Sequence, residues 1–166
     1  AVDMIPNLQV QITFRTTQEN LPYVIQAYDS RVDSFMKVKK YFPYFDATGT
    51  TPEGLCFEAI MNEFLPTNTS TDSYFLNLSD GEPYFNCNGF YYGGDDGLNH
   101  TRSMVKKIEQ MGIKILSYFI WDGGSYYSKD RYMNDFKTMY GKSATDIDVT
   151  SINQITKTIN NLFLQK

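Results

Sequence analysis

Two short apolar runs constrain this chain more than any other feature of its sequence. Residues 73–78 and 113–120 are largely apolar, and each run stops shortly before an Asp-Gly pair, at Asp80 and at Asp122. Strands buried on both faces of a parallel sheet have this pattern, because neither face needs polar residues. Helical segments lie between and after the two runs. The sequence therefore predicts an α/β fold with an open, doubly wound, mostly parallel, Rossmann-like sheet flanked by helices.

The segments around these runs show helical spacing of apolar residues. The first predicted helix begins at Thr51, which would cap it, has Pro52 in its first helical position, and ends before Pro66. The other expected elements are helices over 101–111, 129–140 and 151–163, a flexible loop over 89–97 and a short extended piece over 147–149.

The amino-terminal part has the alternation of apolar and polar residues that is typical of half-buried strands. This pattern predicts strands over 8–14 and 23–28, separated by the turn-prone residues 16–20. The aromatic and lysine-rich stretch 33–45 could be irregular or helical, since its pattern favours neither.

Composition bounds the class of protein. The 166 residues, 42% hydrophobic, suffice for the core of one domain. The net charge of -4 argues against a nucleic-acid-binding surface, because there is no excess of Lys and Arg to neutralise phosphates. No apolar run approaches the ~20 residues that span a bilayer, and the first residues lack the layout of a signal peptide. The expectation is a cytoplasmic protein that binds neither nucleic acid nor membrane.

The cysteine and histidine content argues against a zinc site. Cys56 and Cys87 form no Cys-x-x-Cys pair, and His100 is the single histidine of the chain. We expect two free thiols in a reducing compartment and a solvated loop histidine.

Three Asn-x-Ser/Thr sequons would favour a secreted protein. One of them lies inside the predicted buried strand 73–78, so we discount this signal. The three are at Asn68, Asn77 and Asn99.

Polar residues that directly follow buried strands are candidates for a binding site, because open α/β sheets bind ligands at the carboxyl ends of their strands. Asp80 follows the run 73–78, and Gly81 lets the backbone turn sharply beside it. Thr51 opens a predicted helix, whose N-terminus is electropositive. Because Mg²⁺ takes about six oxygen ligands, Asp80 and Thr51 are candidate ligands. A plain Asp-Gly turn and a plain helix cap are the alternatives.

The order of these features resembles the second half of a von Willebrand factor type A (VWA) domain. A Thr-led helix, a buried strand ending in Ser-Asp-Gly-Glu-Pro at 79–83, a further helix and the strand 113–120 follow one another as in that family. The likeness is closest to the VWA domains of cobaltochelatase-type subunits, and it extends from about residue 8 to residue 163.

The resemblance implies a metal-ion-dependent adhesion site, or MIDAS, made of an Asp-x-Ser-x-Ser motif, a threonine and a later aspartate. By that likeness Thr51 corresponds to the threonine, with Thr50 as a possible substitute, and Asp80 to the aspartate, with Mg²⁺ or Mn²⁺ as cofactor. The first motif is absent. Residues 46–50 have the form Asp-x-Thr-x-Thr, but Pro43 disfavours the central strand that should precede them.

In this family the first strand of the sheet is central and precedes the missing motif. Without that strand two inner edges of the sheet would be unpaired. Residues 1–6 look like the end of the helix that should follow the motif. We therefore expect residues 1–166 to be a single VWA-like domain that lacks its first central strand and forms the carboxyl-terminal part of a longer polypeptide.

The resemblance implies a protein-binding module that has no catalytic activity of its own. An acidic residue of a protein ligand would complete the coordination of the cation. The chelatase likeness points to an AAA+ ATPase of the MoxR or chelatase type as partner, with this chain as a non-catalytic subunit of an ATP-dependent metal chelatase. The alternatives are a metal-dependent hydrolase using Asp80 and Glu82, and an extracellular VWA adhesion domain. The aromatic residues of 84–92 could contact a partner or pack on the domain itself.

Overall fold

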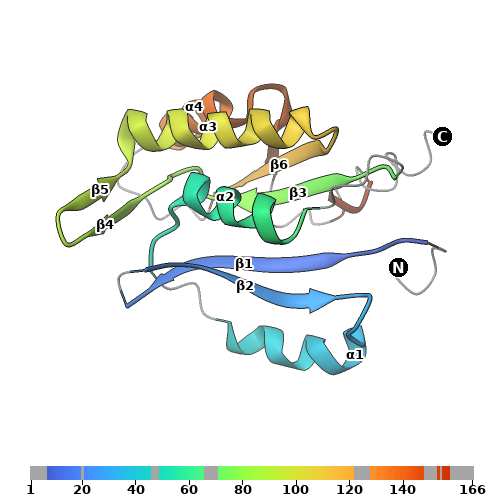
Figure 1. The fold of residues 1–166 in the computed structure, drawn as a ribbon. Helices are drawn as coiled ribbons and strands as arrows, with labels where there is room; N and C mark the ends of the chain where they lie inside the picture. The colour runs from blue at the N-terminus through green and yellow to red at the C-terminus, as the bar shows by residue number, and fades with distance from the viewer. Residues whose placement is uncertain are drawn as a thin grey trace.

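The structure is a computed structural model of the chain, and it describes residues 7–19, 21–45, 49–65, 71–121, 128–147, 153 and 155–157. Figure 1 shows the path of the chain. In chain order the elements are β1 (Gln11–Gln18), β2 (Leu21–Asp29), α1 (Phe35–Val38), the 3-10 helix η2 (Lys39–Tyr44), α2 (Glu53–Glu63), β3 (Tyr74–Ser79), β4 (Phe85–Cys87), β5 (Phe90–Tyr92), α3 (Gly94–Gln110), β6 (Lys114–Ile120), α4 (Lys129–Tyr140), η3 (Gly141–Ser143) and β7 (Ala144–Ile147).

The centre of the fold is a three-stranded parallel sheet in the order β3-β6-β7. Tyr74 of β3 lies opposite Lys114 of β6, and this parallel register continues to the end of β3. The crossovers run through α3 and α4, which lie together over one face of the sheet (Figure 1). The predicted α/β class with a parallel sheet flanked by helices is thus confirmed, and the runs 73–78 and 113–120 form β3 and β6. Of the short extended piece predicted at 147–149, Ile147 is in β7, and residues 148 and 149 lie outside the described part of the chain.

Strands β1 and β2 form an antiparallel hairpin that is a separate sheet. The strand predicted over 8–14 begins and ends later than expected, as Gln11–Gln18. The reason is the short turn between Gln18 and Leu21, in which Glu19 takes a positive φ of 49°. This tight connection leaves Thr16 and Thr17 paired within the hairpin instead of in a turn.

Short helices cover one face of the hairpin. Residues 35–44 form α1 and η2, so the helical alternative for 33–45 is confirmed. Phe14 of β1 stacks on Phe45 with ring centroids 4.7 Å apart, and Tyr28 of β2 meets Phe35 edge-on at 5.6 Å. These aromatic contacts hold α1 and η2 against the strands.

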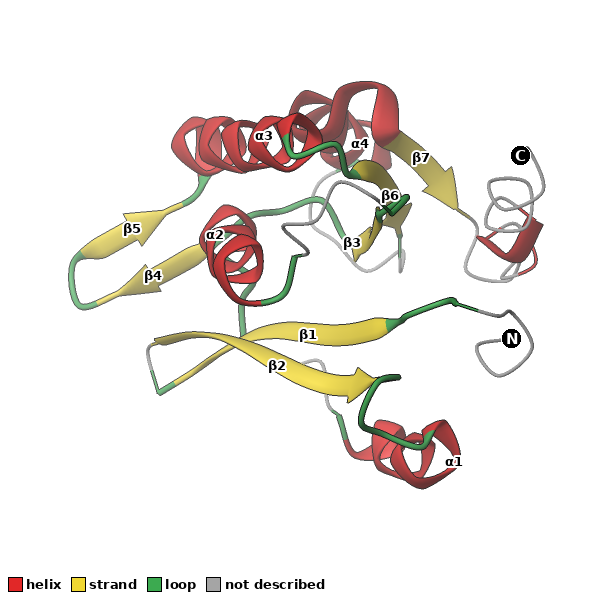
Figure 2. Cartoon of the chain, turned by 45° about the vertical axis from the view of Figure 1, so that its right-hand side comes forward, coloured by secondary structure: helices red, strands yellow, loops and turns green. Residues whose placement is uncertain are grey.

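The main hydrophobic core lies between the parallel sheet and the helices α2, α3 and α4. Figure 2 shows α2 between the β1–β2 hairpin and α3. Contacts of α2 with both β2 and α3 join the hairpin to the helical layer. The buried members of this core are Phe57, Ile60, Met104, Val105, Ile108, Ile113, Ile115, Phe119, Phe136, Met139 and Tyr140.

Two predicted boundaries are wrong. Residues 89–97 are no flexible loop: they contain β5 and the first turn of α3, which begins well before the predicted start at 101. Asp95 and Asp96 occupy this first turn, where negative charge is favourable. Thr51 does not cap α2, because the helix begins at Glu53, and Pro52 stands at its N-cap position without a capping side chain.

Several predictions fall outside the described part of the chain. They concern most of the helix over 151–163, the segment 1–6 and residues 46–48. Within the described residues, no helix combines the length and apolarity needed to cross a membrane.

Candidate functional site

The ends of β1 and β3 and the beginning of α2 come together at one edge of the fold. The Thr50 backbone amide donates to the Thr17 hydroxyl at 2.8 Å, and the two threonine hydroxyls are 3.3 Å apart. These contacts tie the end of β1 to the segment that leads into α2. The carboxyl ends of two strands and a helix N-terminus therefore share one neighbourhood, the arrangement in which α/β folds place binding sites.

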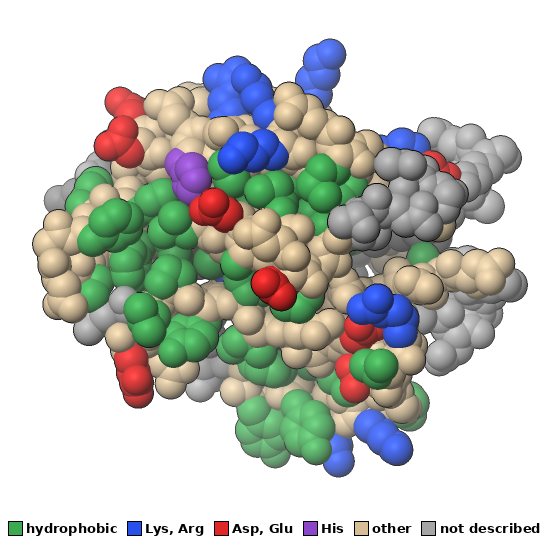
Figure 3. Space-filling model, in the orientation of Figure 1, with side chains coloured by type: hydrophobic (Ala, Val, Ile, Leu, Met, Phe, Trp, Pro, Cys, Tyr) green, Lys and Arg blue, Asp and Glu red, His purple; other side chains and the backbone are tan. Residues whose placement is uncertain are grey.

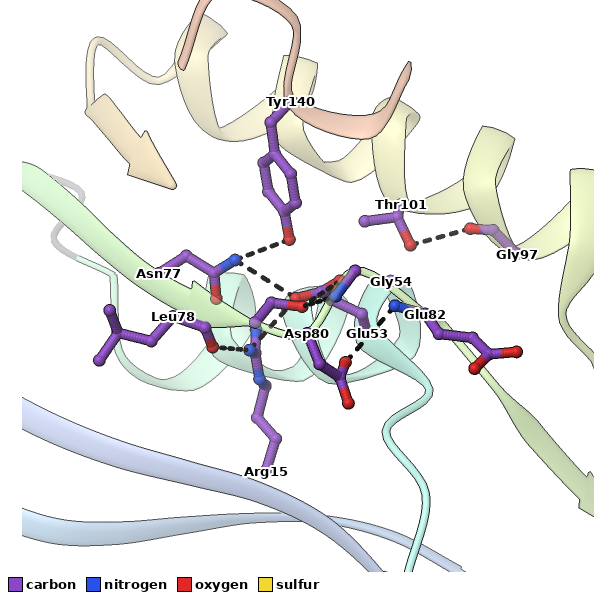
Figure 4. A network of polar contacts seen from close by, with 12 residues as sticks. Arg15, Glu53, Gly54, Asn77, Leu78, Asp80, Glu82, Gly97, Thr101 and Tyr140 are labelled. Atoms are coloured by element: carbon purple, nitrogen blue, oxygen red, sulfur yellow. Dashed lines mark hydrogen bonds and ion pairs between the residues drawn. The ribbon is translucent and has the colours of Figure 1, made fainter. Parts of the chain in front are cut away.

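Glu53, the first residue of α2, is the buried centre of this neighbourhood. Its carboxylate is 1% exposed and pairs with the Arg15 guanidinium at 3.2 Å. The Asn77 side-chain amide donates to Glu53 Oε1 at 3.3 Å, and the Ser79 hydroxyl donates to Oε2 at 3.3 Å (Figure 4). A carboxylate out of contact with water needs such partners, because an unpaired buried charge is very unfavourable.

The network extends to α4 through Tyr140. The Asn77 amide donates to the Tyr140 hydroxyl oxygen at 2.8 Å (Figure 4). Burial raises the pKa of the Tyr140 hydroxyl well above its ordinary value, and the negative charge of Glu53 raises this pKa further. The hydroxyl therefore stays neutral at physiological pH. Asn77 itself is buried in β3, although the prediction that this strand is buried on both faces is wrong, because Leu76 and Leu78 on its other face are exposed.

Arg15 connects the hairpin to the parallel sheet. Besides Glu53, its guanidinium donates to the backbone carbonyl of Leu78 at 3.2 Å (Figure 4). The guanidinium also lies over the ring of Phe57, 5.0 Å from the ring centroid. Sequence reasoning missed both Arg15 and Glu53. A pairing between residues far apart in sequence leaves no local pattern.

Asp80 lies at the surface directly after β3. Gly81 takes a φ of 89°, and a Cβ at this position would lie 2.9 Å from the Phe119 ring, so the turn requires glycine. The Gly81 amide donates to the Ser79 hydroxyl at 3.1 Å, and Asp80 Oδ1 accepts a 3.4 Å bond from the Glu82 amide. The Asp80 carboxylate is thus exposed, and the turn that carries it is held by hydrogen bonds of the Gly81 and Glu82 backbone amides.

Thr51 lies on the half-buried segment just before α2. Its carbonyl accepts a 3.1 Å hydrogen bond from the Tyr84 amide. The bond from Ser79 to Glu53 ties the residue before Asp80 to the first turn of the helix that Thr51 precedes. The segments carrying Thr51, Thr50 and Asp80 are therefore brought to the same edge of the fold.

The oxygen donors at this edge are of the kind that Mg²⁺ and Mn²⁺ prefer. They are the Asp80 carboxylate and the hydroxyls of Thr51 and Thr50, all hard ligands. In the described ranges, no three or more His, Cys, Asp or Glu side chains gather where they could hold a metal ion. A cation at this edge would therefore depend on hydroxyl ligands and water beside one carboxylate.

A second polar cluster joins the N-terminal parts of α2 and α3. The Tyr92 hydroxyl accepts from the Gly54 amide at 3.2 Å and lies 3.0 Å from His100 Nδ1. Thr101, fully buried, donates to the Gly97 carbonyl at 2.8 Å (Figure 4). Burial raises the pKa of Tyr92. The expectation that His100 is a solvated loop residue is wrong, because it belongs to α3 and packs on Tyr92.

The aromatic residues of 84–92 divide between the interior and the surface. Phe85 and Tyr92 are buried, whereas Phe90 and Tyr91 are more than half exposed, at 53% and 59%. Figure 3 shows hydrophobic side chains gathered at the end of the molecule formed by the β4–β5 hairpin. Packing on the domain is thus confirmed for Phe85 and Tyr92, and contact with a partner stays a prediction. The exposed rings also touch the domain at one side, since Tyr91 lies edge-on to Tyr84 at 5.9 Å and Phe90 lies 6.0 Å from Phe85.

Cys56 and Cys87 are both free thiols, as predicted. We expect Cys56 to resist alkylation in the folded protein, because it is 1% exposed and burial raises the pKa of its thiol to about 11. Cys87 is half-buried and should react with iodoacetamide. Mass spectrometry of the labelled native protein, with Cys87→Ser as control, checks this. Equal native labelling rates at the two thiols would contradict the burial of Cys56.

Comparisons with known proteins inform the fold alone. No protein-family model matches the sequence, and no curated protein matches it. The structure is similar to the crystal structure of the pilus adhesin SpaC from Lactobacillus rhamnosus GG, with a TM-score of 0.53 and 14% identity. The match covers 84% of this chain and 22% of the adhesin chain. This chain thus has the fold of one part of a much longer adhesin.

Proposed function

We propose that this chain is a VWA-type, cation-dependent protein-binding module. In this proposal Thr51 and Asp80, with Thr50 as a substitute for Thr51, hold Mg²⁺ or Mn²⁺ at the edge where β1, β3 and α2 meet. An acidic side chain of a protein ligand then completes the coordination. The observation that carries the proposal is the exposed Asp80 carboxylate, which directly follows the parallel strand β3, and the Ser79–Glu53 bond that ties this strand end to the N-terminus of α2.

The local chemistry supports binding in place of catalysis. Glu53, the buried carboxylate nearest to this edge, is already occupied by Arg15 and Ser79. The Glu82 carboxylate accepts a 3.4 Å bond from the Tyr132 hydroxyl. The exposed Asp80 carboxylate can attract a cation, and among the described residues its exposed acidic neighbour in sequence, Glu82, is already engaged by Tyr132. A cation that bridges this chain and a protein ligand would need the exposed Asp80 carboxylate but no general acid or base.

The partner follows from the resemblance of the sequence. The likeness to cobaltochelatase-type VWA subunits supports an AAA+ ATPase of the MoxR or chelatase type as partner, with a cytoplasmic module that carries no chemistry of its own. The fold likeness to a pilus adhesin favours a second candidate, a VWA adhesion domain at a cell surface. The two candidates share the cation-bridged contact and differ in the protein that supplies the acidic side chain.

The proposed cation site predicts metal-dependent stabilisation. Saturating Mg²⁺ or Mn²⁺ should raise the melting temperature, because a ligand that binds only the folded state stabilises it by about 2.7 kcal/mol at a hundred times its Kd. The Asp80→Ala and Thr51→Ala variants should lose most of this rise. Differential scanning fluorimetry with and without the metal measures it.

The matched control is Asp96→Ala, which removes an exposed carboxylate from the first turn of α3. This variant should keep the full metal response. A response that persists in Asp80→Ala and disappears in Asp96→Ala would move the cation to the start of α3. No response in any variant, the unmodified protein included, would contradict the cation site.

A further inference from the structure

The outer side of α1 and η2 combines lysines with exposed apolar side chains. Residues 34–45 contain three lysines and no acidic residue, whereas the whole chain has a net charge of -4. Met36 and Tyr44 are 67% and 82% exposed, Tyr41 is also more than half exposed, and the three lysines are exposed as well. We call this surface the lysine–tyrosine face. Its members are Met36, Lys37, Lys39, Lys40, Tyr41 and Tyr44.

The packing of aromatic rings on the β1–β2 hairpin leaves these side chains on the outside. Phe14 of β1 meets Phe42 edge-on at 6.0 Å, besides its stacked contact with Phe45, so these rings face the strands. Residues three apart lie on the same side of a 3-10 helix, so Tyr41 and Tyr44 of η2 project together. Figure 3 shows hydrophobic and basic side chains next to one another at the lower end of the molecule, where α1 lies in Figure 1.

Acidic residues of the described part of the chain do not balance the positive charge of this face. Asp29 is already paired with Arg31, and the Asp33 carboxylate accepts a 2.8 Å hydrogen bond from the Asp29 amide. No ion pair between described residues involves a lysine of the face. The Lys40 ammonium instead lies 5.0 Å from the centroid of the Tyr41 ring. The face therefore offers uncompensated positive charge and apolar surface side by side.

This combination fits the surface of a bilayer that contains anionic lipids. Tyrosine rings and lysine stems are apolar, while their hydroxyl and ammonium groups stay among the lipid headgroups. A lysine close to an anionic leaflet strengthens binding by about fivefold. A second copy of this chain fits the face poorly, because a symmetric contact would bring two sets of three lysines together. The charge and the exposed rings together favour a lipid surface as the partner.

We propose that the lysine–tyrosine face binds this protein peripherally to membranes that contain anionic lipids. The lysines lie at the anionic headgroups, and Met36, Tyr41 and Tyr44 enter the boundary between headgroups and acyl chains. The β1–β2 hairpin separates this face from α2 and the parallel sheet (Figures 1 and 2), so membrane binding leaves the edge with Asp80 open to a protein ligand.

Membrane binding through this face does not depend on the proposed cation site. The expectation from the sequence that the protein binds no membrane rested on the lack of a spanning run and of a signal peptide. A face that lies on the surface of a bilayer requires neither. The pattern of 33–45 favoured neither helix nor irregular structure, so the outer side of α1 and η2 could not be recognised before the structure.

Vesicle flotation measures the binding. The probes are vesicles of phosphatidylcholine alone and of phosphatidylcholine with about one third phosphatidylserine, and the unmodified chain should bind mainly the second kind. The Lys37→Gln/Lys40→Gln variant should lower the partition coefficient by about 25-fold, since each lysine contributes about fivefold. The matched control is Lys106→Gln/Lys107→Gln, which removes the same charge from exposed positions of α3. This control should change binding by about twofold or less, because charges remote from the membrane are screened.

A third variant separates burial of the rings from attraction of charge alone. Tyr44→Ser removes an 82% exposed ring without changing the charge, and it should weaken vesicle binding by about fivefold. Circular dichroism checks that each variant keeps the fold.

Three results would overturn the proposal. They are a lack of binding to the phosphatidylserine vesicles, an equal loss in the α3 control and in Lys37→Gln/Lys40→Gln, and full binding by Tyr44→Ser. Binding of soluble poly-glutamate in place of the vesicles would assign the face to an acidic protein and would likewise overturn it.

Discussion

Replacing Arg15 by Met is expected to lower the free energy of unfolding by about 3–5 kcal/mol, the usual effect of removing one partner from a buried ion pair. The substitution leaves the Glu53 carboxylate, 1% exposed, without its cation. It also removes the donor to the Leu78 carbonyl, a contact between β1 and β3. Urea unfolding followed by circular dichroism measures the change.

The matched control for Arg15→Met is Lys129→Met. Lys129 pairs with Asp146 at 2.7 Å, but both side chains are nearly half exposed, at 45% and 48%. Such a surface pair contributes about 0–1 kcal/mol, so its loss should be small. A double-mutant cycle with Glu53→Gln separates the interaction energy of the Arg15–Glu53 pair from the other effects of removing the Arg15 side chain. Equal, small effects of the two Met substitutions would show that the Glu53 network does not hold the sheets together.

The second large effect is expected at Gly54, where Ala should lower the free energy of unfolding by about 2–3 kcal/mol. A Cβ at this position would lie 2.4 Å from the Tyr92 hydroxyl oxygen and 2.7 Å from His100 Nδ1. It would also lie 3.0 Å from the Thr101 backbone amide nitrogen, which cannot move without shifting α3. The N-terminal parts of α2 and α3 would have to separate.

Two further variants make the Gly54 prediction specific. Gly97→Ala adds a Cβ whose nearest neighbour, the Pro83 carbonyl oxygen, is 3.1 Å away, so its effect should be clearly smaller. Tyr92→Phe removes the hydroxyl that the new Cβ meets first. The double variant Gly54→Ala/Tyr92→Phe should therefore lose less stability than the sum of the two single variants. Thermal unfolding of the unmodified protein, the three single variants and the double variant tests this, and strict additivity would contradict the proposed close contact.

The central strand β6 could be predicted from the sequence because its burial leaves a local signature, whereas β3 was predicted from its apolar run although Leu76 and Leu78 are exposed. The run 113–120 is apolar throughout most of its length, and it forms β6 with Phe119 fully buried. The start of α3 could not be predicted in the same way. Glycines at 93 and 94 and two aspartates look like a loop, yet the aspartates stabilise the first turn of a helix. Local polarity alone does not distinguish the two.

The polar network at the carboxyl end of β3 shows why only part of the site could be predicted. Asp80 and Thr51 could be singled out because each stands at the boundary of a recognisable element. Glu53 looks like an ordinary polar residue in the first turn of a helix, and only the tertiary structure brings Arg15 of β1 and Asn77 of β3 to it. Whether Thr51, Thr50 and Asp80 bind a cation stays a prediction.

Paramagnetic broadening by Mn²⁺ tests the proposed cation site most directly. In a ¹⁵N NMR titration at low Mn²⁺ concentration, we expect the amide signals of Thr51, Asp80 and their neighbours to broaden first. The exposed acidic pair Asp95 and Asp96 should be affected only at higher concentration, and Asp80→Ala should abolish the early broadening. Signals around Thr51 and Asp80 that stay sharp while those of the acidic pair broaden would contradict a cation site at this edge.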